Sequence, residues 1–274
     1  MNESIFTRTF YFCFLASIVL CLFLYFKRTY INETVVVFCD VGQGDAAYIR
    51  VENKVDILID AGPDNKVLSC LGKYMPFWDH TIELAFLSHP QKDHYGGYLT
   101  ILDHYKIGQF FETHIPTKSS LYDSLEKKLT EENVPTSPLY QNDQLIIGNA
   151  EIDSLWPGKS NVLAFSQAKN DPNIISQVFV FSYKNTRILF TGDIYGRLVE
   201  NIIPNVDIMK TPHHGSANGL TAKMLKLADP FVAVISVGKN NVYGHPSKKV
   251  LDMLQASDLK KRRTDQEGDI VFKL

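Results

Sequence analysis

The chain has 274 residues, of which 45% are hydrophobic and 21% are charged, with 28 basic and 30 acidic side chains. This composition is typical of a folded protein and excludes disordered, collagen-like and disulfide-stapled proteins. The part after residue 200 carries a net charge of +4 and the first 200 residues carry −6. A protein that binds nucleic acid through a uniformly basic surface is therefore excluded, whereas a local site for an anionic substrate stays open.

The four cysteines show no spacing that is typical of cross-links. Cys13 and Cys21 lie in an N-terminal apolar segment, while Cys39 and Cys70 stand alone in a strand-like and a helix-like run. Because no C-x-x-C spacing occurs, we expect neither a disulfide framework nor a thiolate zinc site.

An uncharged apolar run covers residues 9–26 and lies between Arg8 and the pair Lys27 and Arg28. Its length is close to that needed to cross a bilayer, and no small-x-small cleavage site follows it. The run predicts one N-terminal transmembrane helix that is retained as an anchor, and a buried core helix is the alternative. We therefore divide the chain into a membrane anchor with a short linker, residues 1–33, and one globular domain, residues 34–274. The flanking charges nearly balance and do not fix the orientation.

The globular part begins with strands and continues with alternating strands and helices. Runs of β-branched residues between turn residues predict strands, and capped apolar runs predict helices, with Ser120 as the cap of the second. The predicted strands are residues 35–39, 46–51, 55–59, 82–87, 145–147, 150–155, 178–183, 187–190, 206–209, 231–237 and 270–273, and the predicted helices are residues 97–105, 119–132, 195–203, 220–228 and 247–256. This order indicates an α/β (α+β) protein with layered mixed sheets and helices packed outside them.

Side chains that bind metals follow four of the predicted strands. They are His89, Asp93 and His94 after residues 82–87, Asp193 after residues 187–190, His213 and His214 after residues 206–209, and His245 after residues 231–237. Loops that leave neighbouring strand ends lie at one edge of a sheet, so these side chains can converge although they span about 150 positions. Imidazole and carboxylate ligands suit manganese, zinc or iron. The sequence therefore predicts a divalent metal site at this edge.

Two motifs in these loops resemble those of a known superfamily. The segment His89-Pro90-Gln91-Lys92-Asp93-His94 is similar to the H-x-[HD]-x-D-H signature of the metallo-β-lactamase superfamily, and Thr191-Gly192-Asp193 is similar to its second acidic motif. Five further segments resemble the lactamase-like domain of the ComEC competence family, namely residues 40–45 (DVGQGD), 57–62 (ILIDAG), 213–216 (HHGS), 243–246 (YGHP) and 263–268 (RTDQEG). The resemblance runs in order from about residue 34 to the C-terminus.

The resemblance implies an αββα sandwich with the metal at the edge where the strands end. It also implies hydrolysis, with a nucleic-acid phosphodiester as the substrate and DNA uptake as the context. Membrane components of a DNA-uptake apparatus are then candidate partners. The family context favours an extracytoplasmic position for the domain. Full-length family members carry a multi-spanning channel before this domain, whereas here we expect a single anchor.

Two departures from the family pattern affect the expected metal site. Gln91 stands where the family has an acid or a histidine, and its neutral amide is a weak donor. A further histidine of the superfamily is missing, and Asn170, Asn173 and Ser176 occupy the corresponding stretch. We therefore expect one tight metal position and one that is weak or absent. The tight position is predicted to use Asp93, His94, Asp193 and His245, and the weak one His89 and His213.

Catalytic and substrate-binding roles follow from this site. A bound divalent ion activates water near neutral pH, and Asp93 is predicted to orient that water. His214 is predicted to protonate the leaving oxygen, although His213 and His214 can exchange roles. The predicted phosphate contacts are Ser216, Lys239, Asn240 and Asn241, and the alternative for the last three is a plain polar turn. The basic run of residues 260–263 either follows a nucleic-acid backbone or is a solvated charge run.

Three functions are compatible with these residues. The first is a membrane-anchored, metal-dependent phosphodiesterase or nuclease that acts on DNA. The second is a hydrolase of a lactone, thioester or amide, because the fold alone does not choose the substrate. The third is a catalytically weakened binding subunit of a DNA-uptake apparatus, which Gln91 favours and the retained ligands Asp93, His94, Asp193 and His245 oppose.

Overall fold

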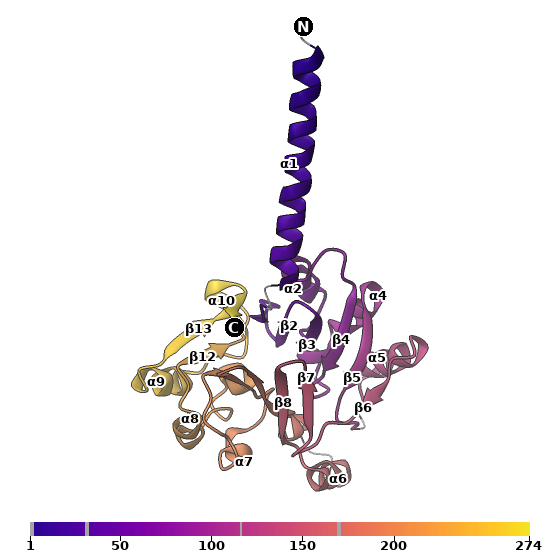
Figure 1. The fold of residues 1–274 in the computed structure, drawn as a ribbon. Coiled ribbons are helices and arrows are strands. Elements are labelled where there is room, and N and C mark those ends of the chain that lie inside the picture. The colour runs from indigo at the N-terminus through magenta and orange to yellow at the C-terminus, as the bar shows by residue number, and fades with distance from the viewer. Residues whose placement is uncertain (1–2, 31–32, 116, 169–170) are drawn as a thin grey trace.

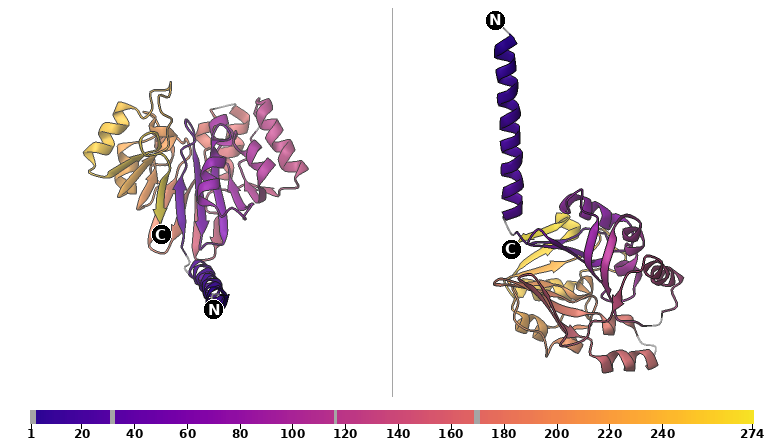
Figure 2. Two further views of the ribbon diagram at one scale, coloured as in Figure 1. Left: turned by 90° about the horizontal axis from the view of Figure 1, so that it is seen from above. Right: turned by 45° about the vertical axis from the view of Figure 1, so that its right-hand side comes forward.

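The structure is a computed structural model that describes residues 3–30, 33–115, 117–168 and 171–274. Two seven-stranded sheets pack face to face, with helices on their outer faces and one long helix, α1 (Glu3–Tyr30), that extends away from the sandwich (Figures 1 and 2). The predicted αββα arrangement is thereby confirmed.

Each sheet is mixed, with one antiparallel and one parallel part. The first sheet has the order β14 (Ile270–Lys273), β1 (Val35–Phe38), β2 (Ala46–Val51), β3 (Val55–Ala61), β4 (Thr81–Phe86), β5 (Lys106–Phe111) and β6 (Thr136–Ser137), and is parallel from β3 onward. The second has the order β13 (Lys260–Arg263), β12 (Val232–Ile235), β11 (Ile208–Lys210), β10 (Thr186–Phe190), β9 (Val178–Tyr183), β8 (Ala150–Trp156) and β7 (Gln144–Ile147), and is parallel from β13 to β10.

Alternation along the strands builds three apolar layers. In β1, Val36 and Phe38 face the core between the sheets, whereas Val37 faces the helices that cover the first sheet. The first sheet is covered by α2 (Lys66–Tyr74), α4 (Tyr98–His104) and α5 (Ser120–Glu131), and the second by α7 (Gly196–Val199), α8 (Ala222–Ala228) and α9 (Lys248–Ala256). The remaining helical segments are α3 (Lys92–Tyr95), α6 (Lys159–Ala168), η1 (Pro172–Ile175), η2 (Pro212–Gly215) and α10 (Thr264–Glu267).

Several elements were not predicted from the sequence, namely β5, β6, β13, α3, α6, η1, η2 and α10, and of α2 only a helix-like run around Cys70 was noted. The basic run of residues 260–263 forms β13 at the edge of the second sheet, where Arg262 pairs with Glu267 and Arg263 pairs with Asp265. Charged side chains are common in edge strands because they discourage pairing with another chain. The cap of α5 is Ser119 rather than Ser120, since the Ser119 side chain accepts a hydrogen bond from the backbone N–H of Tyr122.

A disulfide joins Cys39 to Cys70, so the expectation that these cysteines stand alone was wrong. Cys39 follows β1 on the face of the first sheet that α2 covers, and Cys70 lies on the inner side of α2 with a Cα–Cα distance of 5.8 Å. The two cysteines are 31 positions apart, and the residues between them gave no signal of this contact, which the packing of α2 creates. Cys13 and Cys21 are free and exposed.

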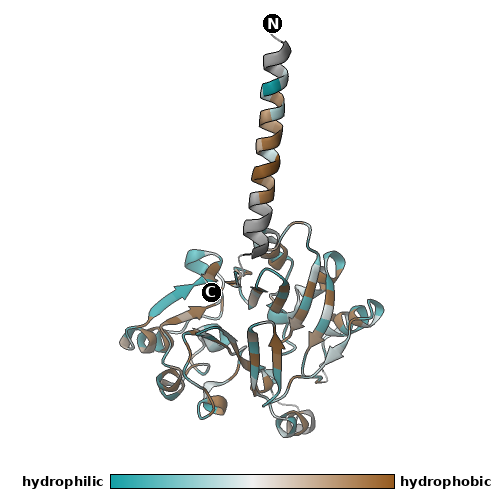
Figure 3. Cartoon of the chain, in the orientation of Figure 1, coloured by the Kyte–Doolittle hydropathy of each residue, from teal (hydrophilic) through white to brown (hydrophobic). Residues whose placement is uncertain are grey.

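The long helix α1 carries a hydrophobic stretch through its middle (Figure 3). The side chains of residues 7–22 are exposed, so the alternative of a buried core helix was wrong. Over the part of the chain that the structure describes, no helix combines the length and apolar character needed to cross a bilayer. The transmembrane segment expected at residues 9–26 is therefore not confirmed.

Candidate metal centre

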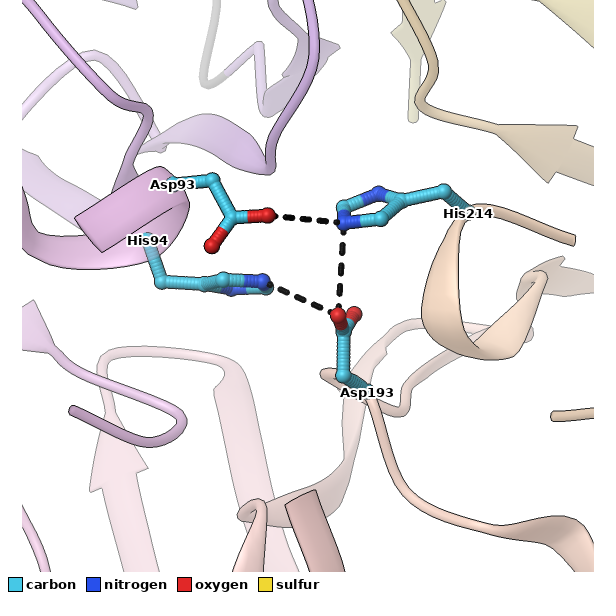
Figure 4. A group of neighbouring side chains, drawn as sticks. All are labelled: Asp93, His94, Asp193 and His214. Carbon is cyan, nitrogen blue, oxygen red and sulfur yellow. Dashed lines mark ion pairs between the residues drawn. The ribbon is translucent and has the colours of Figure 1, made fainter. Parts of the chain in front are cut away.

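Loops from both sheets bring four ligand-type side chains together at one edge of the sandwich (Figure 4). Asp93 and His94 lie in α3, which follows β4 of the first sheet. Asp193 follows β10 and His214 lies in η2 after β11, both in the second sheet. One ligand atom from each of the four side chains lies within 4.8 Å of all the others. This spacing is small enough for one cation to contact all four.

The distances within this group centre on one oxygen of Asp193. Its Oδ2 atom lies 3.4 Å from Nε2 of His94 and 3.3 Å from Nε2 of His214 (Figure 4). Nε2 of His214 also lies 3.4 Å from Oδ2 of Asp93. His94, Asp193 and His214 are buried, and the Asp93 side chain retains 31% exposure. The group is therefore closed on its inner side and open toward solvent at Asp93.

Both imidazoles are oriented by hydrogen bonds from their other ring nitrogen. Nδ1 of His94 lies 2.8 Å from Oδ2 of Asp60, and Nδ1 of His214 lies 3.0 Å from the carbonyl oxygen of Ser236. Because the carboxylate and the carbonyl are acceptors, Nδ1 donates to them, and Nε2 is the nitrogen that can bind a cation once it has lost its proton. Both Nε2 atoms are buried without a hydrogen-bond partner in the described residues. Metal-binding histidines show this arrangement, so the residues fit a divalent cation.

Lys210 lies beneath the group and was not predicted as a site residue. Its ammonium forms an ion pair with Asp45, donates to the carbonyl oxygen of Gly192 at 2.8 Å and lies 3.6 Å from Oδ1 of Asp193. Oδ1 of Asp45 lies 3.2 Å from Nδ1 of His214. The ammonium thus balances the charge of two buried carboxylates and occupies the side of Asp193 that faces away from the imidazoles.

Neighbouring charges together affect the pKa of His94, His214 and Asp193 more strongly than burial does. Burial lowers the pKa of His94, but the charges of Asp193 and Asp60 raise it well above its usual value. Burial also lowers the pKa of His214, but the charges of Asp193 and Asp45 raise it well above its usual value. Burial raises the pKa of Asp193, whereas the charges of His214 and His94 hold it well below its usual value. The carboxylate of Asp193 is therefore ionised at neutral pH, as a cation ligand must be.

Unusual backbone conformations aim the site residues. His213 and His214 have positive φ angles of 49° and 51°, and Gly215 continues the left-handed turn with a φ of 81°. Such conformations cost about 1–3 kcal/mol at each non-glycine residue and persist where the surrounding structure enforces them. Gly44 permits a second close approach, because a Cβ atom there would lie 2.2 Å from the backbone oxygen of Asp93. The loop that carries Asp45 can therefore pack directly against α3.

The other residues predicted as ligands lie near the group but outside it. Nδ1 of His89 lies 3.0 Å from Oγ of Ser88, and burial lowers the pKa of His89 to about 4. Nε2 of His213 lies 3.7 Å from Oδ2 of Asp193. The ring of His245 lies 5.7 Å from the ring of His213. The group thus contains His214 where the sequence predicted His245, because the left-handed turn directs His214 inward.

The predicted phosphate contacts have different environments. Lys239 and Asn240 are exposed, and Ser216 is buried at the end of η2. Asn241 braces its own loop, because its Nδ2 donates to the carbonyl oxygens of Gly238 at 3.1 Å and His245 at 2.7 Å. Both amide hydrogens are used in these bonds, so Asn241 has none left to donate to phosphate in this structure, and its role in substrate binding stays a prediction.

The stretch where the superfamily has a further histidine supports the backbone instead. Oγ of Ser176 accepts a hydrogen bond from the backbone N–H of Asp193 at 3.2 Å. Asn173 is buried, and Asn170 lies outside the described residues. In the described residues, no group of three or more ligand-type side chains that could hold a cation includes His89 or His213.

Asp45 and Asp60 were not predicted as site residues. They lie in the segments 40–45 and 57–62 that carried the family resemblance, and this resemblance was the signal that could have identified them.

The chain belongs to the metallo-beta-lactamase superfamily, whose family model matches residues 39–239. It is 28% identical over 268 residues to ComE operon protein 3 of Bacillus subtilis (strain 168), with 88% of this chain and 33% of that protein covered. It is 24% identical over 259 residues to Competence protein ComA of Neisseria gonorrhoeae, with 89% and 33% covered. The chain thus spans about a third of the length of these relatives, and they confirm the predicted resemblance to the ComEC competence family.

Solved structures with low sequence identity share the fold. The metallo-beta-lactamase fold protein YhfI from Bacillus subtilis has a TM-score of 0.61 at 12% identity, and the match covers 88% of this chain and all of YhfI. The Zn(2+)-bound PqqB from Methylobacterium extorquens has a TM-score of 0.56 at 10% identity, and the match covers 87% of this chain and 100% of PqqB.

Proposed function

We propose that this protein is a membrane-anchored, metal-dependent phosphodiesterase or nuclease that acts on DNA. The observation that carries the proposal is the group of Asp93, His94, Asp193 and His214, whose ligand atoms lie within 4.8 Å of one another. Membership of the metallo-beta-lactamase superfamily supports a metal-dependent hydrolase. The competence proteins among the relatives support nucleic acid as the substrate and DNA uptake as the context.

The proposed cofactor is one tightly held divalent cation, manganese, zinc or iron. Two imidazole nitrogens and two carboxylates suit these ions, and hydrogen bonds to Asp60 and Ser236 hold the imidazoles ready. PqqB, which shares the fold, is a Zn(2+)-bound protein, and this supports a transition metal here. A second position would rely on His89 and His213 and would be weak or absent, since Gln91 supplies no charged ligand.

The bound cation would supply activated water at neutral pH and would neutralise charge on the phosphate. Asp93 faces solvent at the edge of the group and is placed to orient the attacking water. Because His214 belongs to the ligand group, the role of proton donor passes to His213 when the second metal position is empty, and the His213 side chain is 21% exposed. Ser216 and Lys239 remain the proposed contacts to phosphate.

The membrane anchor is proposed to be α1. Its exposed apolar side chains include Phe10, Phe12, Phe14 and Leu15, which have no protein surface to cover them in the described residues. The Cys39–Cys70 disulfide supports an extracytoplasmic domain, because disulfides persist mainly in oxidising compartments. The proposal therefore places the catalytic domain on the oxidising side of a membrane, next to candidate components of a DNA-uptake apparatus.

A cleavage assay with the full chain tests this function. Labelled linear and circular DNA are incubated with the protein and manganese, zinc or magnesium, and the products are separated by size. We expect cleavage that depends on added metal and is lost in the double variant Asp93→Ala/His94→Ala. Equal cleavage by that variant would identify a contaminant. Absence of cleavage with metal bound would favour a lactone, thioester or amide substrate, and absence of both would favour a binding subunit.

A further inference from the structure

The loop between β12 and α9 presents an aromatic ring beside the candidate metal centre. Asn241 braces this loop, since its Oδ1 accepts hydrogen bonds from the backbone N–H groups of Tyr243 at 3.2 Å and His245 at 3.0 Å. The tip is nevertheless exposed, and Tyr243 retains 68% and Val242 91% of their accessible surface. Internal hydrogen bonds thus hold a large apolar surface toward solvent rather than allowing it to fold inward.

Ring contacts connect this tip to the ligand group. The Tyr243 ring lies parallel to the His245 ring, with centroids 6.0 Å apart and an angle of 20° between the planes. The His245 ring lies 5.7 Å from the His213 ring, and Nε2 of His213 lies 3.7 Å from Oδ2 of Asp193. A path of aromatic rings therefore runs from the buried carboxylate to the exposed face of Tyr243.

We propose that Tyr243 is a stacking platform for a nucleobase that flanks the phosphodiester at the metal centre, so that the site takes a strand with unpaired bases. This inference rests on the proposed function and specifies its substrate. Aromatic faces bind bases of any sequence, and nearby cations hold the backbone. Lys239, exposed in the same loop, provides such a cation. In a duplex, neighbouring bases cover each base face, so only an unpaired or terminal base can stack on the ring.

Binding to two probes with equal charge tests the platform. One probe is a labelled oligothymidylate, and the other is an abasic oligonucleotide with the same number of phosphates. Fluorescence anisotropy is measured with the full chain in a chelator, which prevents cleavage. We expect Tyr243→Ala to weaken binding of the base-bearing probe about 5- to 100-fold and that of the abasic probe less than about twofold, because a stacked base contributes affinity in this range. Tyr243→Phe keeps the ring and should bind as the unchanged chain does.

Phe231 provides the matched control. It is 74% exposed and directly precedes β12, at the end of the strand opposite the metal centre. Phe231→Ala should leave both affinities unchanged. The inference is overturned if Tyr243→Ala weakens both probes equally or neither, or if the unchanged chain binds both probes alike. Equal binding of the two probes would leave the proposed nuclease function intact. Failure of the full chain to bind or cleave any nucleic acid would overturn both the stacking platform and the nuclease function.

Discussion

The inner and outer parts of the candidate metal centre are built differently. The inner part, which we term the floor, consists of Asp45, Asp60, His94 and Lys210, all buried and joined by ion pairs and hydrogen bonds. The outer part, the rim, consists of His213, Lys239, Tyr243 and His245, which are partly or fully exposed. In the floor, protein groups satisfy the charges, whereas in the rim water or a ligand must do so.

This difference assigns separate tasks to the two parts. In the floor, Asp60 orients the imidazole of His94 and Lys210 lies against the carboxylate of Asp193, so changes at Asp60 and Lys210 should alter cation binding and protein stability. Lys239 and Tyr243 of the rim are exposed, so changes at these two residues should alter substrate binding and leave the cation and the fold unaffected. A floor variant that weakens only substrate binding, or a rim variant that weakens cation binding, would show that the two parts do not have separate tasks.

The largest effect on stability is expected from Lys210→Met. Removing the ammonium leaves the buried carboxylate of Asp45 with the imidazole of His214 as its remaining neighbour of opposite charge, which should lower the free energy of unfolding by about 3–5 kcal/mol. Denaturant unfolding measures this change. Lys249→Met, at an exposed position on α9, is the matched control and should be nearly neutral. A loss below about 1 kcal/mol for Lys210→Met would show that the floor does not depend on this charge.

Removal of the disulfide tests how much the Cys39–Cys70 bridge stabilises the fold next to the loop that carries Asp45. Cys39 precedes the loop that carries Asp45, and the bridge closes a separation of 31 residues. The double variant Cys39→Ala/Cys70→Ala should lose about 3–4 kcal/mol of unfolding free energy, because the unfolded chain regains the entropy of that loop. Added reductant should destabilise the unchanged chain but not the variant. Equal sensitivity to reductant in both would contradict the assigned bridge, and Cys13→Ala/Cys21→Ala provides the control.

A smaller change should follow from Asp60→Asn. The amide keeps the size of the side chain but weakens its hold on Nδ1 of His94, so zinc affinity should fall about 10- to 100-fold. Competition with a chromophoric chelator measures the affinity. Asp64→Asn is the control, since the Asp64 side chain is exposed and accepts a hydrogen bond only from the backbone N–H of Lys66 among the bonds described. Unchanged zinc affinity in Asp60→Asn would show that the hydrogen bond from His94 to Asp60 does not contribute to cation binding.

The smallest effect is expected at the rim, from Lys239→Ala. Loss of one phosphate contact should weaken DNA binding at every sequence and reduce the slope of log affinity against log salt by about 1. Binding is measured between about 50 and 200 mM salt. Zinc affinity and unfolding should not change. Lys226→Ala, on the exposed side of α8, should leave the salt slope as it is, and an equal effect of both variants would remove Lys239 from the proposed DNA path.

The sequence predicted the layers and the edge at which the site lies, because strand periodicity and ligand-rich loops are local signals. The choice between His214 and His245 was not local, since it depends on the left-handed turn at residues 213–215. Lys210 and the disulfide were missed for a similar reason. A lysine at a strand end reads as solvated until the facing loop brings Asp45 to it, and two distant cysteines meet only once α2 packs on the first sheet.

The proposed function requires cation binding by the group of Asp93, His94, Asp193 and His214. Equilibrium dialysis followed by elemental analysis measures zinc or manganese per chain. We expect about one equivalent in the unchanged protein and less than about 0.2 in Asp193→Ala and in His94→Ala, with the exposed control His104→Ala unaffected. An unchanged protein that binds no ion, or variants that retain a full equivalent, would show that this group is not a cation site.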